Sequence, residues 1–385
     1  MSSSEDLGRL GGICRDAGIM AFDTEFMREK TYYARVCLVQ IAVPDHIWLI
    51  DPLAEIDLAP VAELFADPEI ETVVHAGRQD FEIFYERHGR APSNVFDVQV
   101  AAGFVGLGAS LPYGRLVAEV LGPTLRKGES YTDWCRRPLT EAQLTYAADD
   151  VRYLLELAAA LNRRVAALGR TEWVREELRS LEEEDSYRAD PGSAWKKVSG
   201  RGSLSGRQTA VLKELARWRE AIAMRRDLPR GWVIKDPTLI DVARRQPSSV
   251  NELRAVRGMH SKEVQRSGRE IIEAVKLGRS APPIETPDQL SRAVLARARV
   301  LSGLADAVVR ARAEGADMAT EVVATRAELE AVLAEAIADR LRPERHRLLC
   351  GWRRELAGEA VLALVEGRIA VKVIDEPPYV KEVQV

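Results

Sequence analysis

Short apolar runs separated by turn residues fill the first part of the chain, and their period predicts β-strands. The run Ile19–Phe22 follows a glycine and stops at Asp23-Thr24-Glu25, which favours a buried strand over a helix. The expected strands cover residues 19–25, 33–43, 46–50, 70–75 and 94–98, and the expected helices cover 58–65, 81–87 and 140–155. Strands followed by strand–helix alternation predict an α/β domain with a mixed sheet flanked by helices.

Helical spacing of apolar positions takes over later in the chain. Stretches rich in Gly and Ser precede residue 203, and Pro282-Pro283 marks a second boundary. The predicted organisation is an α/β domain (1–180), a linker (181–202), an all-α domain (203–280), a second all-α segment that loosely repeats the first (281–373) and a C-terminal tail (374–385). A length of 385 residues fits two or three domains.

Two carboxylates stand at the end of the first expected strand. Alternation along a strand puts Asp23 and Glu25 on one face and Thr24 on the other. Like charges at the end of a buried strand repel each other, and a divalent metal between them is the usual solution. The alternative for this stretch alone is a strand that runs out into a polar loop.

Two further stretches carry candidate site residues. Asp80 falls in the first turn of the helix expected after the strand that ends at Gly77, where the helix dipole favours an acid. Tyr146 and Asp150 are four residues apart and share one face of a helix that Thr140 and Gln143 begin as a capping box. His75, at a strand end, is expected to be a hydrogen-bonded structural histidine. Each stretch taken alone also fits an ordinary helix or strand end.

Composition and charge narrow the class of protein. Hydrophobic residues make up 46% and charged residues 30%, and no apolar stretch approaches the roughly 20 residues needed to span a bilayer. The first residues have neither the basic nor the apolar region of a signal peptide, so the expected location is cytoplasmic and no membrane partner is expected. Residues 1–180 carry a net charge of −9 and residues 203–280 a net charge of +8. An acidic first domain and a basic middle domain suggest that one holds metal and the other a polyanion.

The three carboxylate stretches in this order resemble the exonuclease motifs of the DEDD superfamily. Tyr146-x-x-x-Asp150 marks the branch that uses Tyr in the third motif, called DEDDy. Three stretches around these motifs resemble the corresponding sequences of the ribonuclease D family. They are Leu38-Val39-Gln40-Ile41, His75 through Asp80, and Asp133-Trp134 through Thr140. The resemblance implies a ribonuclease H-like sheet and a 3′→5′ exonuclease that uses two divalent metal ions, Mg²⁺ or Mn²⁺.

The resemblance also assigns roles. Asp23 would bridge both ions, Glu25 and Asp150 would complete the site of the water-activating ion, and Asp80 would hold the second. Tyr146 would orient the attacking water and help to remove its proton. A phenol with a pKa near 10 is a poor base at neutral pH, so we expect the metals to do most of the activation and the rate to rise toward alkaline pH. The products would be 5′-mononucleotides.

The all-α domain resembles an HRDC domain. Leu228 through Trp232 and Leu253 through Met259 carry that match, and the family role is contact with nucleic acid. The candidate phosphate contacts are Arg225, Arg226, Arg230, Lys235, Arg257, Lys262 and Arg266. Residues 281–373 resemble a divergent second HRDC domain of nearly neutral charge, which casts doubt on direct RNA contact there.

The leading function is an exoribonuclease, expected to be a monomer, that trims structured RNA 3′ ends such as those of tRNA precursors. One alternative is a DNA 3′→5′ exonuclease of repair type, since contacts to the 2′-hydroxyl lie outside the motifs. The other alternative is a non-catalytic nucleic-acid-binding scaffold. A missing motif carboxylate would favour it, and none is missing.

Overall fold

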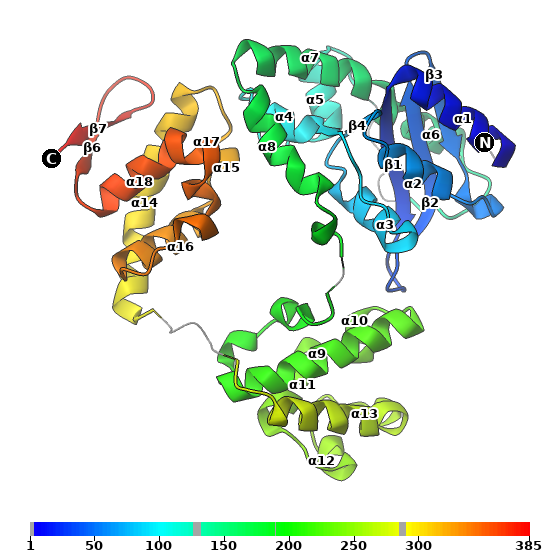
Figure 1. The fold of residues 1–385 in the computed structure, drawn as a ribbon, viewed down its shortest axis with the longest axis vertical. Helices are drawn as coiled ribbons and strands as arrows, with labels where there is room; N and C mark the ends of the chain where they lie inside the picture. The colour runs from blue at the N-terminus through cyan, green and yellow to red at the C-terminus, as the bar shows by residue number, and fades with distance from the viewer. Residues whose placement is uncertain (1–3, 126–131, 189, 285–289) are drawn as a thin grey trace. The chain divides into compact units, whose positions relative to one another are not determined.

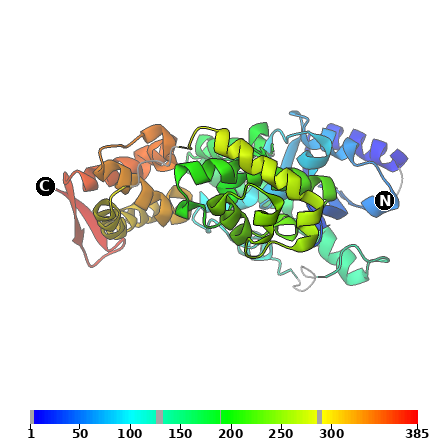
Figure 2. The same ribbon diagram turned by 90° about the horizontal axis from the view of Figure 1, so that it is seen from below.

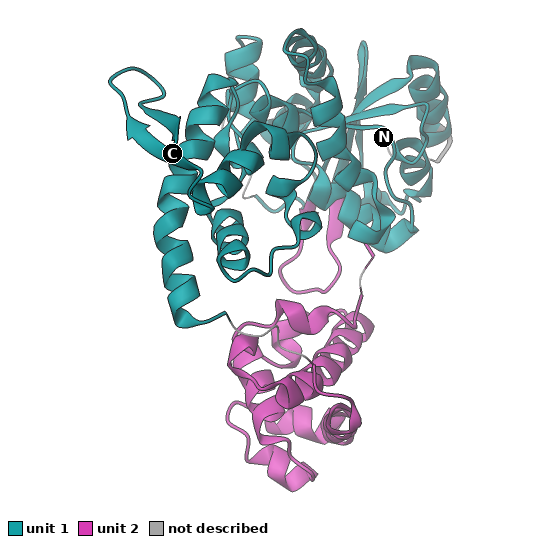
Figure 3. Cartoon of the chain, turned by 60° about the vertical axis from the view of Figure 1, so that its left-hand side comes forward, with its two compact units in different colours: residues 1–25, 38–186, 290–385 teal, residues 26–37, 187–289 magenta. Residues whose placement is uncertain are grey.

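The chain forms two compact units in the computed structural model, which describes residues 4–125, 132–188, 190–284 and 290–385 (Figure 3). Unit 1 comprises residues 1–25, 38–186 and 290–385, and unit 2 comprises residues 26–37 and 187–289. Residues 285–289, which follow the boundary expected at 280–281, lie outside the described residues. Among the residues described, no helix is both long enough and apolar enough to cross a membrane.

Unit 1 contains a five-stranded mixed sheet formed by its N-terminal part (Figure 1). Its strands are β1 (Ile19–Met27), β2 (Arg35–Val43), β3 (His46–Ile50), β4 (Glu71–Val74) and β5 (Val95–Asp97), in the order β3-β2-β1-β4-β5. β3 runs antiparallel to β2, with Val39 opposite Ile50, whereas β4 runs parallel to both β1 and β5. The mixed sheet predicted from the hydrophobic pattern is therefore confirmed.

Helices flank this sheet. They are α1 (Ser4–Ala17), α2 (Ala59–Phe65), α3 (Arg78–His88), α4 (Val98–Gly103), α5 (Tyr113–Val120), α6 (Glu141–Arg152), α7 (Leu154–Ala167) and α8 (Thr171–Glu182). The ring of Phe22 on β1 lies 5.6 Å from Phe65 of α2 and 5.4 Å from Phe84 of α3, centroid to centroid, so α2 and α3 cover the face that carries Phe22. α6 packs near β3 and α7 near β4.

The C-terminal segment packs on the helices of the first domain. It contains α14 (Arg292–Gly315), α15 (Thr320–Val323), α16 (Arg326–Ile337), α17 (Gly351–Arg353), a π-helical turn (Arg354–Gly358), α18 (Glu359–Val365) and the hairpin β6 (Ile369–Val373) and β7 (Val380–Gln384). The Trp352 ring stacks on Trp173 of α8 with centroids 5.2 Å apart, and Arg353 pairs with Glu177 at 2.5 Å. The stretch expected to be a tail, residues 374–385, contains β7, whose residues pair with β6.

Unit 2 is a helical domain built on α9 (Gly206–Arg226). Its other helices are α10 (Arg230–Val233), α11 (Asp236–Arg245), α12 (Val250–Arg254) and α13 (Ser261–Ser280), with α13 packed along α9 (Figure 2). Two short 3₁₀ helices, Ala194–Lys197 and Arg201–Ser203, occupy the second half of the expected linker. Trp195 of the first one packs on the domain core, as do Leu215, Leu239 and Ile271.

The order of helices in unit 2 recurs in the C-terminal segment. α9, α10 and α11 are a long helix, a four-residue helix and a medium helix, and α14, α15 and α16 repeat that order. An aspartate at φ +47° follows the long helix each time, Asp227 after α9 and Asp317 shortly after α14. This repetition supports the predicted internal repeat.

An arm between β1 and β2, residues 26–37, belongs to unit 2. Tyr32 of the arm is buried in the helical core, and its hydroxyl donates to Glu220 at 2.5 Å. The backbone amides of Tyr32 and Tyr33 donate to the Asp227 carboxylate at 2.9 Å and 3.0 Å. The strand that carries Asp23 and Glu25 therefore continues directly into a segment held by the helical domain.

Candidate active site

β1 positions the first two candidate carboxylates as the alternation predicts. Asp23 and Glu25 are half-buried, and Thr24 between them is 6% exposed on the face that also carries Phe22. The Phe22 ring cluster fixes the strand on that side. A strand held by apolar packing on one face thus presents both acids on the other.

Asp80 lies in the first turn of α3, as expected, and is 7% exposed. The helix begins after Gly77, and Ala76 before it has φ +57°, so the chain turns sharply between β4 and α3. The Thr24 hydroxyl donates a short hydrogen bond to the Asp80 carboxylate. The contact joins β1 to α3 directly beside the Asp23–Glu25 face.

α6 carries Tyr146 and Asp150 on one face. Its capping box is present as predicted, with Thr140 and Gln143 each bonding the other's backbone amide. The Tyr146 ring lies against the buried Trp134 with centroids 5.9 Å apart. The segment containing Trp134 is tied to the end of β3 by a bidentate pair in which Arg137 donates twice to Asp51, both at 2.6 Å.

The four carboxylates lie close enough together that their charges shift one another's pKa values. Burial, followed by repulsion from Asp80, Asp150 and Glu25, raises the pKa of Asp23 well above its usual range. Burial, followed by repulsion from Asp150 and Asp80, raises the pKa of Glu25 to about 8. Burial is also the main cause that raises the pKa of Asp80 to about 6 and that of Asp150 to about 7. Strands and helices far apart in sequence therefore gather acids that cannot all ionise without a nearby cation.

This donor set suits hard divalent cations. Carboxylate oxygens are the ligands that Mg²⁺ and Mn²⁺ prefer, and a positive ion would relieve the repulsion that raises these pKa values. Within the described ranges, no three His, Cys, Asp or Glu side chains already form a finished metal cluster. One oxygen of the Asp80 carboxylate accepts the hydrogen bond from Thr24, and a carboxylate with one such bond can still bind an ion.

Asp97 is a buried acid that the motif analysis did not single out. It is 3% exposed and ends β5, and its carboxylate accepts hydrogen bonds from the backbone amides of Ala76 at 3.0 Å and Gly77 at 3.2 Å. The Gln99 amide donates to it at 2.9 Å, which caps α4. Asp97 thus fixes the turn that delivers Asp80. The signal in the sequence that could have identified Asp97 is its position, with Phe96, at the end of an expected strand, where the motif acids also lie.

Tyr113 of α5 also lies near the carboxylates and was not predicted. Its hydroxyl donates to the Asp149 carbonyl at 3.1 Å and accepts from the Tyr153 amide at 3.3 Å. Burial, then repulsion from Asp150 and Asp23, raises its pKa far above the ordinary value, so it is a neutral donor. His75 has the predicted structural role, with its Nε2 2.9 Å from the Leu111 carbonyl oxygen.

The seven candidate phosphate contacts all lie in unit 2, and three of them are engaged there. Arg230 pairs with Glu220 at 2.5 Å and lies over the Tyr32 ring, Arg226 pairs with Glu263 at 3.0 Å, and exposed Arg225 pairs loosely with Glu270 at 3.8 Å. The other four are exposed and form no ion pair in the part of the chain that the structure describes. These are Lys235, Arg257, Lys262 and Arg266.

Comparisons with known proteins agree with this geometry. Residues 3–166 match the family described as 3′-5′ exonuclease, and residues 208–275 match the HRDC domain. Ribonuclease D of Granulibacter bethesdensis is 36% identical over 97% of this chain and 94% of its own length, and that of Jannaschia sp. is 38% identical over 91% and 90%. The crystal structure of Escherichia coli RNase D superposes with a TM-score of 0.81 at 31% identity, covering 95% of this chain and 98% of that chain. This chain therefore belongs to the ribonuclease D family.

Proposed function

We propose that this chain is a 3′→5′ exoribonuclease that releases 5′-mononucleotides by hydrolysis with two divalent metal ions. The observation that carries the proposal is the set of four mutually repelling carboxylates from β1, α3 and α6. Membership of the ribonuclease D family supports RNA as substrate, and the E. coli relative is described as acting in structured RNA processing. Structured RNA 3′ ends, tRNA precursors among them, are the proposed substrates of a monomeric enzyme.

Asp23, Glu25, Asp80 and Asp150 are the proposed metal ligands. Two divalent ions held by these residues would supply an activated water and neutralise charge on the leaving 3′ oxygen. Asp23 is the proposed central ligand, because the charges of the other three acids all act on its pKa. Asp97 would keep the Asp80 turn in place.

Tyr146 is the proposed group that orients the attacking water. Its ring is braced by Trp134, which is 2% exposed, so the phenol is held on a fixed surface one helical turn from Asp150. A braced phenol positions a hydrogen bond with little loss of side-chain entropy, which suits a water that must approach phosphorus in line.

The test is single-turnover digestion of a 3′-extended tRNA and a DNA hairpin of the same sequence, with Mg²⁺ and with Mn²⁺. We expect metal-dependent release of 5′-mononucleotides from the RNA by the wild type and a loss of at least about 1,000-fold in Asp23→Ala, which removes the bridging ligand. Tyr146→Phe should retain metal binding and lose about 10- to 100-fold in rate. Faster cleavage of the DNA would instead indicate a DNA exonuclease. Binding of RNA without cleavage would indicate a scaffold.

A further inference from the structure

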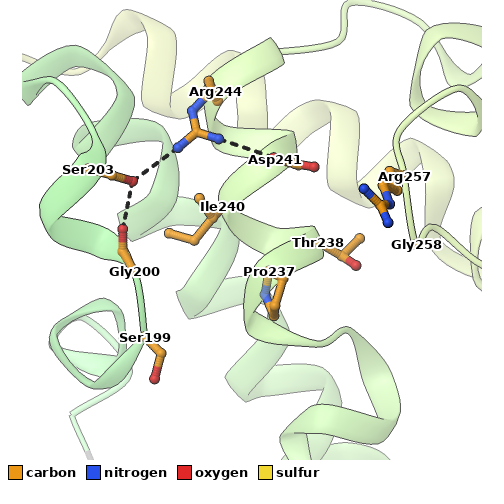
Figure 4. Close-up of a pocket in the computed structure, with 10 residues that line it drawn as sticks. All are labelled: Ser199, Gly200, Ser203, Pro237, Thr238, Ile240, Asp241, Arg244, Arg257 and Gly258. Carbon is orange, nitrogen blue, oxygen red and sulfur yellow. Dashed lines mark hydrogen bonds and ion pairs between the residues drawn. The ribbon is translucent and has the colours of Figure 1, made fainter.

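The hollow drawn in Figure 4 lies within unit 2. It has a volume of about 630 Å³, and Arg257, one of the candidate phosphate contacts, is among its lining residues. Arg244 also lines it and donates to Asp241 at 3.2 Å and to Ser203 at 3.0 Å. This hollow is therefore part of the surface where contact with nucleic acid is already expected.

In unit 1, the chain breaks its helical path just after a proposed metal ligand. α6 ends at Arg152 and α7 begins at Leu154, and Tyr153 between them has φ −104° and ψ −1°, away from α-helical values. Asp150 lies in the last turn of α6. A break in a helix usually has a specific cause, such as a proline or a side chain inserted into the backbone hydrogen bonds. Residues 141–167 contain no proline, so the cause lies elsewhere.

The Tyr113 hydroxyl supplies such an insertion. In a continuous helix the amide of Tyr153 would donate to the carbonyl of Asp149, four residues earlier. The hydroxyl takes this place, because it accepts from the Tyr153 amide at 3.3 Å and donates to the Asp149 carbonyl at 3.1 Å. Burial above all raises the pKa of this phenol, so its single proton remains available to the carbonyl. Two bonds through a side chain therefore replace one backbone hydrogen bond in the turn that contains Asp150.

Elements other than α6 and α7 hold Tyr113 in place. It begins α5 and follows Leu111, whose carbonyl oxygen lies 2.9 Å from Nε2 of His75 and accepts from the Gln99 side chain at 3.4 Å. His75 comes directly after β4, and its ring lies 5.6 Å from the Tyr113 ring, centroid to centroid. Leu116 and Val117 bury the inner face of α5. The hydroxyl that interrupts the helix is thus anchored from outside it.

The turn after β4 therefore supports two proposed metal ligands by different routes. It leads directly into α3, which carries Asp80 in its first turn. Through His75 and Tyr113 it also reaches the last turn of α6, which carries Asp150. One short segment thus fixes ligands on two helices that are far apart in the sequence.

We infer that Tyr113 is a positioning residue for the metal site. By occupying a place in the backbone hydrogen-bond ladder, its hydroxyl ends α6 and holds the Asp150 carboxylate among the other acids. The inference rests on the proposed metal-dependent hydrolysis and adds a residue, outside the four ligands and Tyr146, on which ion binding depends. The alternative is that Tyr113 contributes only to the stability of the fold, and experiment separates the two.

The test measures Mn²⁺ binding to the full-length protein by isothermal titration calorimetry without RNA, so that ion binding is observed apart from hydrolysis. The variants are Tyr113→Phe, Asp150→Asn and the double variant that combines them. Phenylalanine keeps the ring but can neither accept nor donate a hydrogen bond, so the interrupted backbone bond can close. The matched control is Tyr85→Phe, which removes a tyrosine hydroxyl that donates to the Glu184 side chain at 2.8 Å rather than to the backbone.

We expect Tyr113→Phe to raise the dissociation constant for Mn²⁺ about 10-fold, as is typical when a residue that orients a metal ligand is lost. In the Asp150→Asn background the same change should alter it less than about 2-fold, because the ligand that it positions is gone. Tyr85→Phe should stay within about 2-fold of the wild type. The melting temperature of Tyr113→Phe in EDTA should stay within about 3 °C of the wild type, because the closed backbone bond offsets the two bonds lost. Single-turnover hydrolysis of RNA by Tyr113→Phe should need more Mn²⁺ and come within about 3-fold of the wild-type rate at saturation.

Wild-type affinity for Mn²⁺ in Tyr113→Phe would overturn the inference. An equal loss of affinity with and without Asp150 would overturn it as well, because that result would indicate general loosening of the fold. Hydrolysis of RNA by the wild type together with either result would leave the proposed function intact and reject the positioning role alone. The expected pattern of Mn²⁺ binding without hydrolysis would reject the exonuclease function and retain the role of Tyr113.

Discussion

Replacement of Glu25 by Gln should stabilise the metal-free protein at alkaline pH while it removes a proposed metal ligand. Burial and the charges of Asp150 and Asp80 raise the pKa of Glu25 from 4.5 to about 8. The folded chain therefore holds a proton on Glu25 that the unfolded chain releases once the pH exceeds 4.5. Because the unfolded state binds fewer protons in this window, the free energy of unfolding falls as the pH rises from about 4.5 to about 8.

The size of the effect follows from the same shift. Each pKa unit corresponds to about 1.4 kcal/mol, so ionised Glu25 costs the folded state at most about 4 kcal/mol at pH 8. Asp80 and Asp150 titrate in the same range, so removal of one charge also lets its neighbours ionise more readily. We expect Glu25→Gln to gain about 1–3 kcal/mol at pH 8 and less than about 1 kcal/mol at pH 5.

Urea unfolding in EDTA at pH 5 and pH 8, followed by repetition with Mg²⁺, measures these differences. Mg²⁺ should stabilise the wild type more than Glu25→Gln at pH 8, because an ion that binds the folded state adds to its stability by mass action. Glu69→Gln, at an exposed position away from the site, is the matched control and should change little. An equal gain at both pH values, or a loss of stability at pH 8, would refute the reasoning.

Two further predictions concern residues around the site. Thr72→Val should raise the free energy of unfolding, measured by urea denaturation, by about 1 kcal/mol. The buried Thr72 hydroxyl has no hydrogen-bond partner among the described residues, and valine has the same shape. A loss of stability would show that the hydroxyl is satisfied. Asp97→Asn should reduce single-turnover cleavage about 10-fold and raise the Mg²⁺ concentration that gives half-maximal rate. The two carboxylate oxygens accept from Ala76 and Gly77 separately, and an amide nitrogen in place of one of them cannot accept its bond. An unchanged Mg²⁺ requirement would reduce Asp97 to a purely structural role.

The parts of the fold that depend on local pattern were predictable. Strand alternation placed Asp23 and Glu25 opposite Thr24, and the capping box located the start of the helix that carries Tyr146. α1 was not predicted, although Leu7, Leu10 and Cys14 form its buried stripe. Gly8, Gly11 and Gly12 interrupt that pattern, and glycine lowers helix propensity by about 1 kcal/mol per residue.

The parts that depend on long-range contacts were not predictable. The contact of Thr24 with Asp80 spans 56 residues, and the hydrogen bond of Tyr32 to Glu220 spans 188. Arg230 illustrates the difficulty, because sequence alone gives its charge but not the Glu220 carboxylate beside it. Such pairings arise only when separate elements meet, so neither periodicity nor composition contains them.

Buried carboxylates in proteins are usually paired with cationic groups, but the four acids of this site are not. The surrounding fold holds them together in spite of their repulsion. β1 is fixed by the Phe22 cluster, α3 by the bonds of Asp97 to its leading turn, and α6 by its own capping box. None of these supports runs through the four metal-site acids themselves, so the elements that carry the acids stay in place despite the repulsion between the side chains. A divalent cation would relieve the repulsion between like charges held together in this way, and violations of local rules of this kind are typical of functional sites.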